Sequence, residues 1–126
     1  MKRVVSVSIG SSTRDSKAII SVCGQEFSIE RIGTDGDIDK AVELIKELDG
    51  KVAALGMGGI DLYLWSGNRR YVLREAKKLA RAAQITPIVD GSGLKNTLER
   101  RAIEYLAADS PELFQGKRVM LTCAVD

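Results

Sequence analysis

Residues 90–97 have the residue types and spacing best suited to chemistry in this chain. They read Asp-Gly-Ser-Gly-Leu-Lys-Asn-Thr and join a predicted strand to the start of a predicted helix. Free N–H groups and the dipole at a helix start favour an anion, and glycines let it approach the backbone. The structural alternative is a glycine turn with a capping serine. The candidate anion- or substrate-binding residues are Gly91, Ser92, Gly93, Asn96 and Thr97.

Lys95 lies in the first turn of that helix, where the dipole opposes a cation by a few tenths to about 1 kcal/mol. A sequence selected only for stability more readily places Asp or Glu there. Lys95 therefore indicates an anionic ligand, and Asp61 or Asp90 can hold its ammonium group and join it in proton transfer. We name Lys95, Asp61 and Asp90 as candidate catalytic residues. The alternative is a lysine that points into solvent.

Two further polar glycine segments follow predicted strands, at residues 10–15 and 56–61. If the strands are parallel neighbours, these segments and residues 90–96 meet at the carboxyl end of the sheet, where ligands bind in such folds. Glycines after strands also serve plain turn geometry. The candidate binding residues added here are Ser11, Ser12, Gly58 and Gly59.

Asn68 and Arg69 are also candidate binding residues, because an arginine can hold a carboxylate or phosphate through two N–H groups. The alternative is a small satellite core around Trp65, capped by surface arginines. The acidic residues of segment 33–37 are suited either to Mg²⁺ or Ca²⁺ or to a helix cap. We expect the cap, from Asp35 or Asp37, and no metal, because the segment lacks a Glu at EF-hand spacing.

The composition excludes several classes of function. The chain has no histidine, which rules out a Ser-His-Asp triad, a Cys-His pair and a histidine general base. Its charges are interspersed and sum to +2, so we expect a small anionic metabolite as partner rather than nucleic acid or a membrane. Cys23 and Cys123 fall in predicted strands, which indicates buried, reduced thiols. With no signal peptide in view, the expected location is the cytoplasm.

The chain pattern predicts an α/β fold in three layers, with a mainly parallel central sheet, helices on both faces and an antiparallel hairpin near an edge. Alternating strand and helix in the later part implies right-handed crossovers. Gly24-Gln25 is a two-residue loop with glycine first, as a type II′ hairpin turn requires. Residues 61–65 and 71–73 flank either a second small hairpin or an irregular excursion. The predicted strands cover residues 4–9, 17–23, 26–32, 52–55, 85–89 and 118–124, and the predicted helices cover 74–84, 94–108 and a stretch ending near Asp49.

The whole chain, residues 1–126, is expected to form a single α/β domain. The strand at 118–124 has no following helix to cover it. We expect either a C-terminal edge strand or the N-terminal domain of a longer protein.

Three stretches of the sequence carry a resemblance to a known family. Residues 31–37, 59–71 and 87–100 are similar to the N-terminal part of proteins from thermophilic clostridial bacteria described as quinate or shikimate 5-dehydrogenase-like. The resemblance covers the whole chain. It implies a Rossmann-like fold and NAD(P)-dependent interconversion of a ring hydroxyl and a ketone.

The sequence departs from that family at the catalytic motifs. Shikimate dehydrogenases have an Asn-Val-Thr-x-Pro-x-Lys stretch and an Asn-Thr-Asp stretch that supply a Lys–Asp pair. Here Ile85-Thr86-Pro87 lacks the lysine and Gly33-Thr34-Asp35 lacks the asparagine, so no catalytic residue is carried over. Asn96 stands where the dinucleotide fingerprint needs its third glycine, so this chain binds NAD(P) through no complete motif.

Three functional hypotheses follow. The first is the N-terminal domain of a dehydrogenase-like protein that oxidises or reduces a hydroxy-acid ring substrate only together with further chain. The second is a non-catalytic module that binds a phosphorylated or carboxylated metabolite. The third is a structural domain that forms a homodimer through its last strand.

Overall fold

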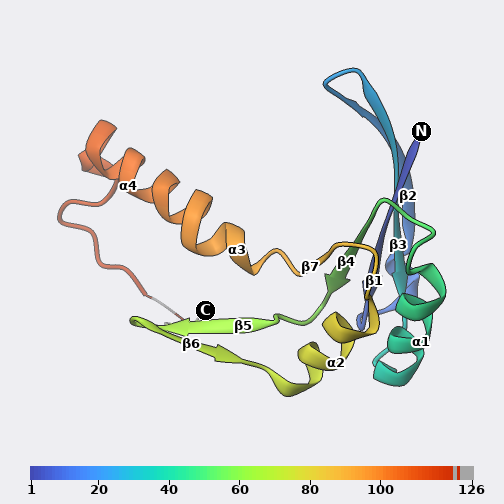
Figure 1. Cartoon of the computed structure of the whole chain (residues 1–126). Helices are drawn as coiled ribbons and strands as arrows, with labels where there is room; N and C mark the ends of the chain where they lie inside the picture. The colour runs from blue at the N-terminus through green and yellow to red at the C-terminus, as the bar shows by residue number, and fades with distance from the viewer. Residues whose placement is uncertain (121, 123–126) are drawn as a thin grey trace.

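The central sheet has five strands, and four of them run parallel. The computed structural model describes residues 1–120 and 122, without the side chain of Asn96. The strand order is β2-β3-β1-β4-β7, and only the β2–β3 pair is antiparallel (Figure 1). The predicted α/β class, mainly parallel sheet and edge hairpin are confirmed. The strands are β1 (Lys2–Ser8), β2 (Ser16–Val22), β3 (Gln25–Gly33), β4 (Ala54–Gly58) and β7 (Ile88–Val89).

Two helices, α1 (Ile38–Leu48) and α2 (Arg74–Ala82), pack on this sheet. The crossovers β3–α1–β4 and β4–α2–β7 advance in the same direction across the sheet. Two right-handed crossovers in one direction place both helices on the same face. One core therefore contains residues from both helices and from that face: Val5, Val7, Ala41, Ile45, Leu48, Leu55, Met57, Ala76, Leu79 and Ala82.

The predicted second helical layer differs from what is observed. In the described part of the chain neither helix of the core lies on the other face of the sheet, to which the register assigns Val4, Ile29 and Val89. Ile29 and Val89 are exposed. The reason is the connection from β1 to β3, which is made by a short 3₁₀ turn, η1 (Ser12–Arg14), and by β2 rather than by a covering helix. We call this side the open face.

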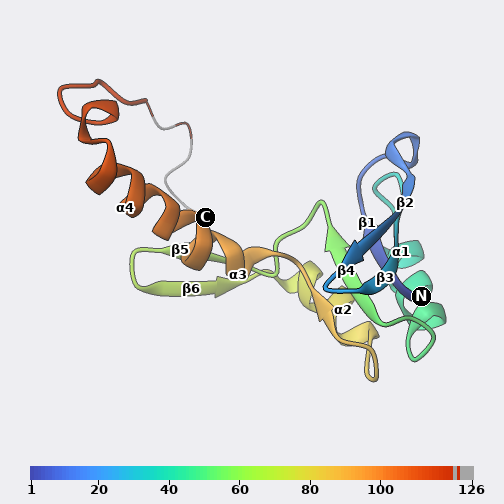
Figure 2. The same cartoon turned by 90° about the horizontal axis from the view of Figure 1, so that it is seen from above.

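An arm leaves the body of the protein after β4 and β7. It consists of a hairpin, β5 (Tyr63–Ser66) and β6 (Arg69–Val72), and of a continuous helix in three segments. These are α3 (Ser92–Leu94), a π-helical segment (Lys95–Glu99) and α4 (Arg100–Asp109), followed by the turn η3 (Pro111–Leu113). Both views show the helix and the hairpin reaching away from the sheet (Figures 1 and 2). Every residue of α4 is exposed.

Several predicted boundaries need correction. The first hairpin turns at Cys23-Gly24 instead of Gly24-Gln25, because both residues have positive φ, 50° and 77°, as a type I′ turn requires. Cys23 is consequently exposed instead of buried. Strand β4 extends through Gly56 and Gly58, which we had placed in a loop.

The third predicted helix begins two residues earlier than expected, and β7 is limited to two residues. Of the predicted strand 118–124, residues 118–120 and 122 are not in a strand. The remaining residues of that strand, including Cys123, lie outside the described part. No described helix is long and apolar enough to cross a membrane.

Candidate functional site

The structure brings Lys95 and Asp61 together, which is one of the two pairings that the sequence predicts for Lys95. The ammonium Nζ of Lys95 lies 3.5 Å from both carboxylate oxygens of Asp61. Lys95 comes from the first turns of the arm helix, and Asp61 from the segment between β4 and β5. Both side chains are about one-third exposed, at 31% and 38%. Both charged groups are thus accessible from solvent.

The Asp90 carboxylate is held by hydrogen bonds from Leu62 and Ser92. Its carboxylate accepts hydrogen bonds from the amide of Leu62 at 2.5 Å, from the amide of Ser92 at 3.1 Å and from the Ser92 hydroxyl. Burial raises the pKa of Asp90, but the hydrogen bonds from Ser92 and Leu62 outweigh it and lower the pKa below its ordinary value. Asp90 is therefore a fixed negative charge at a helix start, where the dipole favours one.

Ser92 and Thr97 use their polar groups within the protein. Ser92 is buried with its hydroxyl on Asp90. The Thr97 hydroxyl donates to the carbonyl of Gly93 at 2.7 Å, as helical threonines often do. The prediction for Asn96 concerns a side chain outside the described part. An anion bound at this helix start would thus compete with the Asp90 carboxylate for the hydrogen bond of the Ser92 amide.

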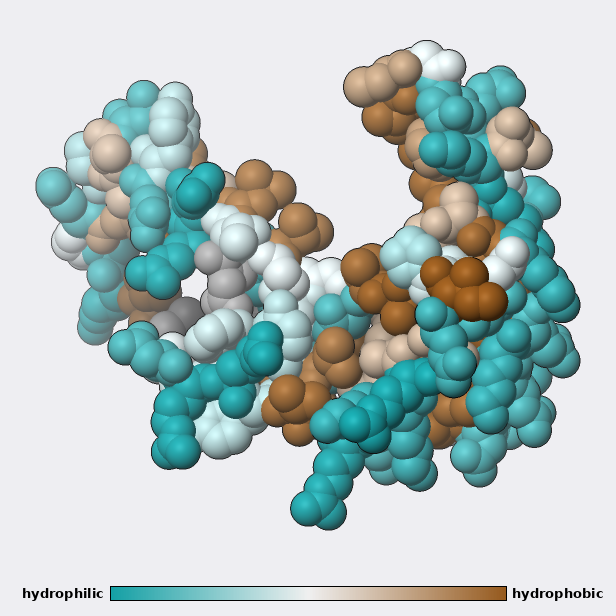
Figure 3. All heavy atoms as spheres, in the orientation of Figure 1, coloured by the Kyte–Doolittle hydropathy of each residue, from teal (hydrophilic) through white to brown (hydrophobic). Residues whose placement is uncertain are grey.

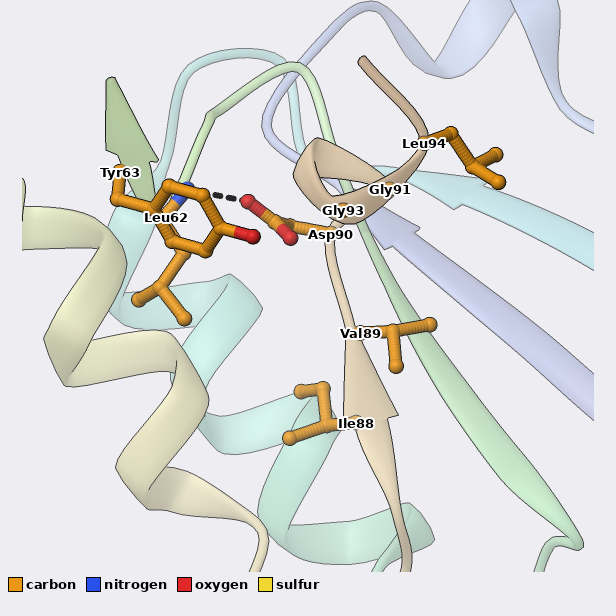
Figure 4. Close-up of a pocket in the computed structure, with 8 residues that line it drawn as sticks. All are labelled: Leu62, Tyr63, Ile88, Val89, Asp90, Gly91, Gly93 and Leu94. Atoms are coloured by element: carbon orange, nitrogen blue, oxygen red, sulfur yellow. Dashed lines mark hydrogen bonds between the residues drawn. The ribbon is translucent and has the colours of Figure 1, made fainter. Parts of the chain in front are cut away.

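A pocket of about 540 Å³ opens beside Asp90. Figure 4 shows Leu62 and Tyr63 on one side of the segment that joins β7 to α3, and Val89 and Leu94 directed to the other side. The lining is mainly apolar, and Asp90 is its charged member. Asp61 directly precedes the lining residue Leu62 in the sequence, and Lys95 directly follows the lining residue Leu94. The full lining is Leu62, Tyr63, Ile88, Val89, Asp90, Gly91, Gly93 and Leu94.

Sequence reasoning missed the apolar part of this pocket. Tyr63 borders this pocket, since its hydroxyl would lie 3.9 Å from a methyl group placed on Gly93. The sequence pattern predicts Ile88 and Val89 as strand residues and gives no sign that they line a pocket. The available signal was the position of all three next to polar segments at strand ends.

The glycine segment at residues 10–15 and the residues just before it are hydrogen-bonded to the segment at residues 33–37. The amides of Thr34, Asp35 and Gly36 donate to the carbonyls of Ser8, Gly10 and Ile9. The Ser12 amide donates to the Asp35 carboxylate at 2.7 Å, and the Ser11 hydroxyl accepts from the Thr13 amide. Ser11 and Ser12 are therefore committed to internal structure.

Gly58 and Gly59 serve close packing. A Cβ on Gly58 would lie 2.8 Å from the Cβ of Ser8, and Gly59 has a φ of 72°. Asp37 caps α1 by accepting from the Lys40 amide at 2.9 Å. Among the described residues no three acidic or cysteine side chains are grouped as a metal site would require.

Asn68 lies in the turn of the β5–β6 hairpin (Figure 1), and Arg69 begins β6. The Arg69 guanidinium lies 5.9 Å from the ring centre of Tyr71, and Arg70 lies 5.2 Å from that of Tyr63. Trp65 packs edge-on against Tyr63, with ring centres 6.4 Å apart. This arrangement matches the alternative of a satellite aromatic cluster with arginines on it.

Comparison with known proteins gives one match. The family model described as Domain of unknown function (DUF8753) matches residues 3–90, which is more than half of the chain. The match covers the sheet, both core helices, Asp61 and Asp90, and it ends before the arm helix. No curated protein and no solved structure matches.

Proposed function

This chain belongs to the DUF8753 family, and we propose that it is the substrate-binding domain of a quinate/shikimate dehydrogenase-like protein. The observation that carries the proposal is the Lys95–Asp61 pair next to an apolar pocket. The pocket offers apolar walls to a carbon ring, and the pair offers a cation and a proton donor to the polar groups of that ring. The resemblance described above supplies the substrate class.

The charges set the orientation of such a ligand. The carboxylate of a hydroxy acid is repelled by Asp90 and attracted to the Lys95 ammonium. Ring hydroxyl groups can donate to the free lone pairs of the Asp90 carboxylate. Lys95 is suited to pass a proton to or from a ring oxygen, and Asp61 holds the ammonium in position.

NAD(P), when bound to such an enzyme, supplies hydride transfer. The residues described in this chain do not fit its pyrophosphate. The backbone amides at the rim that would bind the pyrophosphate donate hydrogen bonds to protein carbonyls instead. Methyl groups placed on Gly33 and Gly58 would collide with neighbouring segments of the same chain, so these glycines are needed for packing. We therefore assign to this chain substrate binding and proton transfer, and no cofactor step.

A calorimetric titration with quinate and with shikimate tests the proposal. Lys95→Ala should abolish or strongly weaken binding, because it removes the cation that meets the carboxylate. Its melting temperature should be unchanged or slightly raised, since a cation in the first turn of a helix is unfavourable. Lys78→Ala, on the exposed side of α2, is the matched control and should bind as the wild type does. A lowered melting temperature with unaltered binding would show that Lys95 is structural.

A second candidate, a non-catalytic module for an anionic metabolite, is favoured by the same misfit to a dinucleotide. The two are distinguished by assaying NADP-linked oxidation of quinate and shikimate with this chain and with an extended one. Turnover by the extended chain alone supports the dehydrogenase proposal. Tight binding of a phosphorylated or carboxylated compound without turnover by either supports the module.

A further inference from the structure

The open face of the sheet has the wrong polarity for a surface in contact with water. In the β2–β3 hairpin and β1, every second residue points to this face. The register aligns apolar residues in adjacent strands there: Ala18 with Ile29 and Val4, and Ile20 with Phe27. Ile20, Val22 and Ile29 are 40%, 49% and 37% exposed. We call the open-face patch the set of Val4, Ala18, Ile20, Val22, Phe27 and Ile29.

The opposite face of the β2–β3 hairpin carries charged residues beside Ile19, which is 63% exposed. Glu30 lies there, with its carboxylate 2.7 Å from Arg3 and 2.6 Å from Lys17. At this edge of the sheet the helix side is therefore mixed in polarity, whereas the uncovered side carries the continuous apolar patch. Parallel sheets are normally covered by helices on both faces. The sequence pattern thus demands a cover over the open-face patch.

The arm helix has a matching apolar surface. Leu94, Leu98, Ala102 and Leu106 recur every four residues, which places them along one side of a helix. Leu98 is 63% exposed and Leu106 is 39% exposed, so neither is covered by its own chain. Figure 3 shows hydrophobic residues on both walls of the hollow between the sheet and the arm. The same chain therefore presents an uncovered sheet face and an uncovered helix.

The exposed area has the size that an obligate dimer removes. The chain exposes 9047 Å², whereas a compact monomer of its mass exposes roughly 6,600 Å². The excess of roughly 2,400 Å² compares with the 1,000–2,500 Å² or so that each subunit buries in an obligate dimer. A chain that exposes this much more surface than a compact monomer, with a continuous apolar patch on its sheet, is not expected to stay monomeric.

We propose that two copies exchange arms, so that the arm helix of each copy covers the open-face patch of the other. The arm helix spans 18 residues, from Ser92 to Asp109, or about 27 Å at helical rise. Five strands span about 19 Å, so the helix is long enough to cross the sheet. The exchange is two-fold symmetric, since each copy gives an arm and receives one. It supplies the third layer that each sheet lacks.

The hinge of the exchange is Gly91. It has a φ of 84° at the junction of β7 and α3, and no atom lies within 4 Å of a methyl group placed on it. The left-handed conformation directs the helix away from its own sheet. The polypeptide therefore leaves the body at a residue that can adopt this geometry without strain.

Sedimentation or light scattering of the full chain tests the arm exchange. The expected mass is twice the 13.7 kDa of one chain. Ile20→Glu on the open-face patch and Leu98→Lys on the arm should each reduce the mass to that of the monomer. Mixing the two variants should restore the dimer, because one arm–face contact is then wild type and the other pairs Glu with Lys. Ile85→Glu is the matched control: Ile85 is 79% exposed and belongs to neither surface, so this variant should remain dimeric.

A cysteine cross-link covers the case in which a charged variant fails to fold. With both native cysteines replaced by serine, one copy carries Ile20→Cys and the other Leu98→Cys. Mild oxidation of the mixture should give a covalent dimer, and neither variant alone should give one. A monomeric wild type, a mixture that stays monomeric, or a mixture without the cross-link would overturn the proposal. A dimer that Ile20→Glu dissolves and Leu98→Lys leaves intact would instead show association through the edge of β2.

Discussion

Replacing Gly33 by alanine tests whether the rim glycines exist for packing or for a ligand. Gly33 ends β3, and a Cβ placed on it would lie 2.6 Å from the carbonyl carbon and oxygen of Ser11 and from the nitrogen of Ser12. Ordinary contacts begin at 3.4 Å. All three atoms are backbone, so none can rotate away, and the η1 turn must move. That movement weakens the hydrogen bond from the Gly33 amide to the Asp15 carboxylate, which is 2.6 Å long.

We expect Gly33→Ala to lose about 3 kcal/mol, the upper part of the range for overpacking. In a chain of this length that lowers the melting temperature by roughly 10–15 °C. The assay is urea unfolding followed by circular dichroism. Gly93→Ala is the control, because its nearest neighbour would be the Tyr63 hydroxyl at 3.9 Å, and a helical Gly→Ala change is neutral or stabilises by up to about 1 kcal/mol. If both variants unfold at the wild-type urea concentration, the packing account of the rim is wrong.

Two further predictions concern stability. Leu79→Ala removes a side chain with no exposed surface in α2 and should cost about 2–5 kcal/mol in urea unfolding; a loss below about 1 kcal/mol would mean that α2 is not firmly docked. The Asp49 carboxylate accepts hydrogen bonds from the backbone amides of Thr86, Gln84 and Ile85, and these bonds lower its pKa from 3.8 to about 2. Its stabilising contribution is therefore complete above pH 3.8 and lost as the pH falls towards 2. Asp49→Asn should be less stable at neutral pH and should lose less stability over that acidic range, which unfolding curves at several pH values will show; parallel curves for both proteins would contradict the assignment.

The parts of the fold that follow from local pattern were predictable. The stripe of Ala41, Ile45 and Leu48 at helical spacing gave α1, and Asp37 gave its cap. The glycine at residue 24 located a hairpin but not its register, since only the paired φ angles of Cys23 and Gly24 decide between turn types. Gly56 and Gly58 suggested a loop, whereas both lie in β4, where Ser6 and Ser8 of the neighbouring strand approach them closely. Cross-strand contacts of this kind have no local signature.

The candidate site was partly predictable for a similar reason. Charge chemistry singled out Lys95 and proposed Asp61 or Asp90 as its partner, and the structure pairs it with Asp61. Lys95 and Asp61 are 34 residues apart in the sequence, so the fold and not the local pattern determines the distance between them. Which side of the sheet stays uncovered depends on the order of the crossover connections. The alternation of apolar and polar residues in β2 and β3 identifies that side only when the order of the crossovers is known.

NMR chemical-shift mapping with shikimate and quinate tests the central claim most directly, with inorganic phosphate as the reference anion. For the ring acids we expect saturable shifts at the amides of Leu62, Tyr63, Gly91, Gly93 and Lys95, and the loss of these shifts in Lys95→Ala. Phosphate should shift the amides near Lys95 without those of Leu62 and Tyr63, because it has no ring to enter the pocket. Shifts confined to the segments around Ser11 and Asp35, or no saturable shift with either acid, would contradict the claim that this pocket binds a hydroxy-acid ring.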